Sequence, residues 1–161
     1  MRTYRFFLAG CAVFALSLAN DPMTHAQKSK SSYACTEAKP ELLCAASTCG
    51  SASQPCYVDI KRTNNGASAT PSLAGAKGNS PFCVKAGTSV VWKSDTKHQG
   101  FIIDMGPTSP FGTDDIIGGS NRSVNTVAKT PGCYKYSVGA CISGEIYGMC
   151  GNNTAEVIIL K

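Results

Sequence analysis

Apolar and polar residues alternate in short runs along most of this chain, and this alternation predicts β-strands rather than helices. The runs are rich in β-branched and aromatic residues, which suit a pleated, half-buried surface. Turn-forming residues separate them, and only residues 41–46 suggest a turn or two of helix. The expected strands are residues 57–62, 82–84, 89–93, 100–104, 124–128, 133–138 and 155–160.

Two stretches between these runs predict loops, because glycine, proline and small polar residues dominate them. They are residues 66–81 and residues 105–121. Six or seven short strands separated by such turns indicate an all-β domain, a Greek-key β-sandwich or barrel.

The first residues have the pattern of a secretory signal peptide. Two arginines precede an uncharged apolar run at 6–19, and a small residue, Ala26, ends the polar segment that follows. The run is shorter than the roughly 17–25 apolar residues of a membrane-spanning helix. We therefore expect a signal peptide at 1–26, with a cut near Ala19 as the second choice. The remainder, with no transmembrane segment of its own, is expected to be periplasmic or extracellular.

The number of cysteines indicates that disulfide bonds stabilise the exported chain. The expected cleavage removes Cys11 and leaves an even number of cysteines, which in an oxidising compartment indicates disulfide bonds. Their spacing does not reveal which cysteines pair. A cysteine-rich segment at 27–55 is expected to precede a β-domain at 56–161. The eight cysteines are Cys35, Cys44, Cys49, Cys56, Cys83, Cys133, Cys141 and Cys150.

The charge pattern excludes one class of partner. The formal net charge is +5, but the basic residues are scattered. Nucleic-acid interfaces need clustered basic residues with a supporting motif, and the chain has neither. An unknown protein or cell-surface partner is the expectation instead.

The order of several motifs resembles that of the cupredoxins, the plastocyanin- and azurin-type copper proteins. Residues 84–92 match a V-x-x-G-x-x-V-x-W hairpin, and His98 follows near the family's first ligand position. Residues 131–136 match a P-G-x-Y-x-Y strand, residues 148–149 resemble the Gly-Met that closes the copper loop, and residues 157–160 match the last strand. The resemblance implies a cupredoxin-type β-sandwich over about residues 57–161.

The resemblance fails at the copper ligands. A type 1 copper site uses two histidines and a cysteine thiolate, with a weak axial ligand. After the expected cleavage His98 is the only histidine, and Val138 lies closest to the family's cysteine position. The expected function is therefore that of a binding or structural module without a cofactor. It is not expected to be an enzyme, because only His98 is available as a base for a nucleophile.

One alternative is a copper-binding or electron-transfer cupredoxin. It would use His98 and Met149 with an unpaired Cys141 or Cys150, because thiolates and thioethers suit Cu(I). A disulfide between Cys141 and Cys150 that closes the same loop is the favoured interpretation. A second alternative is an inhibitor or effector whose active part is residues 35–56.

The first prediction concerns processing. When the full chain is produced in a host with a secretory pathway, the exported protein should begin at Gln27, because Ala26 ends the cleavage pattern. N-terminal sequencing together with the intact mass checks this. An exported protein that keeps residues 1–26, and His25 with them, contradicts it.

Overall fold

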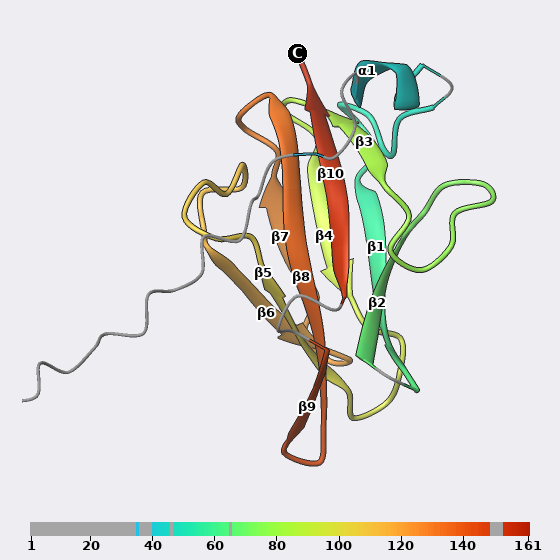
Figure 1. Ribbon diagram of the computed structural model, residues 1–161, viewed down its shortest axis with the longest axis vertical. Coiled ribbons are helices and arrows are strands. Elements are labelled where there is room, and N and C mark those ends of the chain that lie inside the picture. Colours follow the sequence, from blue (N-terminus) through green and yellow to red (C-terminus); the bar gives the residue numbers. More distant parts are fainter. Residues whose placement is uncertain (1–34, 36–39, 46, 65, 149–152) are drawn as a thin grey trace, which may run out of the picture. The chain divides into compact units, whose positions relative to one another are not determined.

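The computed structural model describes residues 35, 40–45, 47–64, 66–148 and 153–161. Contacts within the chain separate residues 1–30 from residues 31–161. The predicted signal peptide lies outside the described residues, which all belong to the second unit. Figure 1 shows its strands in two layers.

The first sheet has four strands in the order β2-β1-β4-β7. β1 pairs with β4 in parallel, and its pairing with β2 is antiparallel, as is that of β4 with β7. The strands are β1 (Cys56–Thr63), β2 (Gly66–Pro71), β4 (Ser89–Lys93) and β7 (Val124–Val127).

The second sheet has the order β3-β10-β8-β5-β6, and β9 pairs with β8 beside this path. Only β3 and β10 pair in parallel. The strands are β3 (Phe82–Lys85), β5 (Gly100–Asp104), β6 (Asp115–Gly119), β8 (Gly132–Ile142), β9 (Glu145–Gly148) and β10 (Thr154–Leu160). The prediction of an all-β sandwich is confirmed.

Three strands lie where the sequence predicted loops or gave no strand signal. β2 buries Ala67 and Ala69, which are small enough to hide the alternation that marks bulkier strands. β6 has one buried and one exposed isoleucine, followed by two glycines that weaken its strand signal. β9 is short and folds back on β8 through a two-residue turn, so its existence depends on that pairing.

Trp92 lies at the centre of the core and is fully buried. Its ring meets those of Phe82, Phe111 and Tyr136 edge-on, at centroid distances of 6.4, 5.7 and 5.6 Å. Edge-to-face packing adds to the free energy of burial. The indole N–H donates to the Thr126 hydroxyl at 2.9 Å, so the one polar atom of the ring is satisfied.

The sequence predicted a hairpin at 84–92, and the structure has two strands, β3 and β4, joined there by a tight turn. The two strands belong to different sheets and do not pair with each other, so the turn is a corner between the sheets and the hairpin prediction is wrong. Gly87 takes φ 89°, a value that favours glycine. Val90 and Trp92 are both fully buried, whereas Val91 between them is only partly buried. The alternation along this strand therefore places the tryptophan in the core.

Among the described residues, three disulfides join the cysteine-rich segment at 27–55 to strands of the two sheets. Two of them reach strands of the second sheet, so the segment is held by the β-domain rather than by a core of its own. A short helix, α1 (Pro40–Leu43), is the one helix in the described residues, which contain no helix long and apolar enough to cross a membrane. The pairs are Cys35–Cys133, Cys44–Cys83 and Cys49–Cys56.

The second prediction concerns the buried indole. Thr126→Val should lower the free energy of unfolding by about 1–3 kcal/mol, because it leaves the N–H of Trp92 without an acceptor. Thr126→Ser keeps the hydroxyl and should cost less. Urea denaturation followed by tryptophan fluorescence measures both. Equal stabilities for the two variants would show that the hydrogen bond contributes nothing.

Candidate functional site

The connection from β4 to β5 carries His98, the candidate ligand singled out by the sequence. His98 is exposed and has φ 60°, a left-handed conformation that few residues other than glycine adopt, although histidine is among the enriched types. Gln99 follows directly and is only 1% exposed. The chain therefore turns at His98, leaving that residue at the surface and sending the next side chain into the interior.

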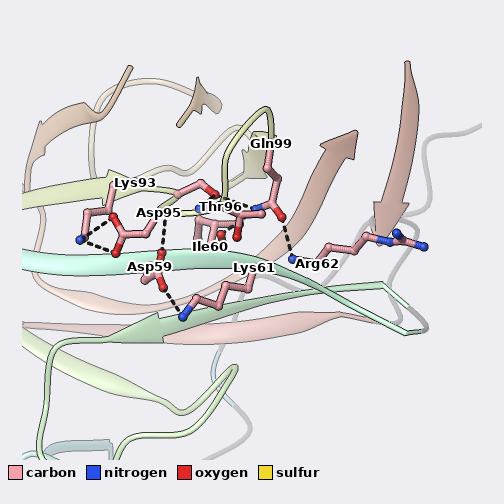
Figure 2. Close-up of polar contacts among 9 residues, drawn as sticks. Asp59, Ile60, Lys61, Arg62, Lys93, Asp95, Thr96 and Gln99 are labelled. Carbon is pink, nitrogen blue, oxygen red and sulfur yellow. Dashed lines mark hydrogen bonds and ion pairs between the residues drawn. The ribbon is translucent and has the colours of Figure 1, made fainter. Parts of the chain in front are cut away.

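The side-chain amide of Gln99 joins this connection to β1 (Figure 2). Its Nε2 donates to the backbone oxygen of Ile60 at 2.7 Å and to the Ser94 hydroxyl at 2.8 Å. Its Oε1 accepts from the backbone N–H of Arg62 at 3.1 Å. Both amide hydrogens and the oxygen are used, as a buried amide requires. The position of His98 thus depends on a hydrogen-bonded residue beside it.

Ion pairs and a hydrogen bond also link the β4–β5 connection to β1 at the protein surface, as Figure 2 shows. Lys61 pairs with Asp59 at 2.9 Å and Lys93 pairs with Asp95 at 2.8 Å, while the backbone N–H of Asp95 donates to Asp59. The hydrogen bond to Asp59 raises the pKa of Lys61, and the hydrogen bond to Asp95 raises that of Lys93. These exposed pairs contribute little stability, and their effect is to orient the turn.

The structure describes two of the four candidate copper ligands. His98 is on the exposed turn. Cys141 is on β8 opposite Gly100, partly buried, and forms no disulfide with another described cysteine. Met149 and Cys150 lie outside the described residues. Both the Cys141–Cys150 disulfide and the copper alternative stay predictions.

Among the described residues, three potential metal-ligating side chains of His, Cys, Asp or Glu type come together at one place only. They are Cys35, Cys133 and Glu156. The two cysteines form a disulfide, and Glu156 pairs with Lys135 at 3.7 Å. This cluster is therefore a cross-link with an ion pair beside it.

The interior beside β5 and β8 is hydrocarbon at the position that the resemblance assigns to the copper cysteine. Val138 is fully buried opposite Ile103, and Ala140 is fully buried opposite Phe101. None of these four side chains has an atom that ligates a metal.

The segment after β8 forms a β-hairpin, visible as the projecting β8–β9 pair in Figure 1. Ser143 and Gly144 have φ of 54° and 84°, the pair of positive values that a tight hairpin turn uses. The guanidinium of Arg62 lies 3.8 Å from the ring centroid of Tyr147, which ties β9 to the end of β1.

A pocket of about 300 Å³ opens beside His98, and we call it the His98 pocket. It is formed by the start of β5, the end of β6 and the turn that follows β6. The residues that line it are 98–100 and 117–122.

A second cleft of about 510 Å³ continues from this pocket between β6 and β7, which end their respective sheets; we call it the open edge. Ile117 and Arg122 line both hollows. Ile117 and Val127 are 56% and 43% exposed there.

The sequence pointed to His98 but not to Arg122. The sequence feature that could have indicated Arg122 is the pair of glycines that ends β6 shortly before that residue.

The comparisons with known proteins add little to this description. No family model and no curated protein matches the chain. A solved structure of an oxidised point mutant of amicyanin, a cupredoxin, matches 70% of this chain and 91% of its own, with 12% sequence identity and a TM-score of 0.37.

The third prediction tests the buried amide. Gln99→Leu should lower the free energy of unfolding by about 2–5 kcal/mol, because the backbone groups of Ile60 and Arg62 lose their partner in the interior. His98→Asn is the matched control, because asparagine also tolerates a left-handed backbone. Its effect should stay within about 0.5 kcal/mol. Denaturant unfolding measures both, and a Gln99→Leu protein as stable as the parent contradicts the account.

Proposed function

We propose that this chain is an exported, disulfide-stabilised binding module with a cupredoxin-like fold, that it works without a type 1 copper centre, and that it is not an enzyme. Its partner is a protein or cell-surface component, and no cofactor takes part. The alternative of a copper or electron-transfer protein has no specific support among the described residues.

The observation that carries this proposal is that His98 is exposed, whereas the next residue, Gln99, is buried. A type 1 site brings two histidines and a cysteine thiolate together around one copper ion. Here the histidine is exposed, and the side chain that enters the interior beside it is an amide whose donors and acceptor are already used. The hydrocarbon side chains around Val138 also support a site without copper.

The open edge supports a binding role. β6 and β7 each have one neighbour in their sheets, so each leaves a row of backbone groups available to an added segment. Ile117 and Val127 add apolar surface beside these strands. Exposed apolar side chains around a cleft at a sheet edge are typical of a surface that another molecule covers.

Export is supported by two independent features. The described residues contain three disulfides, which persist in oxidising compartments. The apolar run at 6–19 has the length and flanks of a signal peptide. Together they favour a protein that works outside the cytoplasm.

The fourth prediction is that the processed protein does not form a blue copper centre. After incubation with copper and passage over a chelating resin, it should retain no stoichiometric copper and show no intense blue absorbance, because His98 lacks a second histidine. Metal analysis and the visible spectrum measure this.

His98→Asn and Cys141→Ser serve as controls for this test. If the parent protein keeps one copper with intense blue absorbance, and either variant loses it, the copper alternative replaces the proposal. Weak copper binding that both variants retain would arise elsewhere and would leave the proposal standing.

A further inference from the structure

We propose that the His98 pocket binds an oxyanion, a phosphate, sulfate or carboxylate group, with Arg122 and His98 as its principal contacts. The inference rests on the proposed binding function and names the chemical class of its ligand. It concerns the pocket alone and does not depend on what covers the open edge.

The charges around the pocket favour an anion. Arg122 and His98 both line it, and no acidic side chain does. Within the described part of the chain, neither the guanidinium nor the imidazole has an ion-pair partner. Arginine presents planar paired donors that match the oxygens of an oxyanion, and the imidazole of histidine adds a further donor. Ser120 contributes a hydroxyl from the same rim.

Two glycines in the wall of the pocket let neighbouring groups pack directly against their backbone. A β-carbon at Gly118 would lie 2.4 Å from the ring of Phe101 and 2.6 Å from the backbone oxygen of Arg122. One at Gly119 would lie 3.2 Å from the backbone oxygen of Gln99. The ring of Phe101 and these backbone oxygens occupy the space that side chains would need, so this wall of the pocket is fixed by packing.

The turn that carries Arg122 is held at both ends. The backbone N–H of Arg122 donates to Gly119 at 3.0 Å, and that of Gly119 donates to Arg122 at 2.9 Å. The N–H of Ser120 donates to the backbone oxygen of Gln99 at 2.9 Å. The turn that carries Arg122 is therefore joined through Ser120 to Gln99, the residue beside His98, and less backbone ordering is needed when an anion binds.

The positive character is local to this pocket. The neighbouring open edge has Asp115 among its lining residues along with Lys129 and Arg122, so its charges are mixed. Lys129 does not line the His98 pocket. It therefore provides a matched position at which one positive charge is removed from the adjoining surface without touching the proposed site.

The test is a titration of the processed protein with inorganic phosphate, sulfate and acetate at constant ionic strength, with chloride as the reference. Amide chemical shifts in the ¹H–¹⁵N spectrum should move saturably at residues 98–100 and 117–122. Arg122→Gln should weaken the affinity about tenfold or more, because it removes a charge-assisted contact. Lys129→Gln should change it by less than about twofold, because exposed charges outside the contact are screened.

His98→Asn keeps the left-handed backbone and should also weaken binding, with an unchanged spectrum elsewhere as evidence that the variant is folded. The relative affinities of the three anions identify the preferred group. Shifts that never saturate, or equal losses in Arg122→Gln and Lys129→Gln, would overturn the site. Its failure would leave the copper test untouched, whereas a blue copper centre would overturn the proposed function and not this titration.

Discussion

Gln99 reaches from the β4–β5 connection into a core composed mainly of hydrocarbon side chains and forms three hydrogen bonds there. Two of them go to the backbone of β1, so this one amide fixes the distance between that strand and the connection. An unsatisfied buried amide is costly, which makes any other arrangement of this turn unfavourable. The surface position of His98 follows, because the chain turns at His98 directly before the buried Gln99.

The same residue joins the interior to the candidate site. Its backbone oxygen receives the N–H of Ser120, and the pairing of Gly100 with Gly119 continues this contact along β5 and β6. The side chain of Gln99 thus faces the core while its backbone supports the pocket. The backbone around this pocket is thus positioned by packing and hydrogen bonds.

Much of the fold could be predicted from sequence, because strands with bulky alternating residues, such as β4 with Val90 and Trp92, carry a clear signal. β2 could not, since Ala67 and Ala69 leave no visible pattern. His98 stood out as the only histidine after the expected cleavage, but its direction depends on β1 atoms 37 and 39 residues before Gln99. Contacts so distant in sequence leave no local pattern, and Arg122 was missed for the same reason.

The central claim is that Gln99, and not His98, occupies the interior beside β1. Hydrogen exchange of the Gln99 side-chain amide, followed by NMR on the processed protein, tests it most directly. The account predicts that both Nε2 hydrogens exchange far more slowly than those of exposed glutamines, because both are bonded in the core. Exchange as fast as that of an exposed side chain would contradict it.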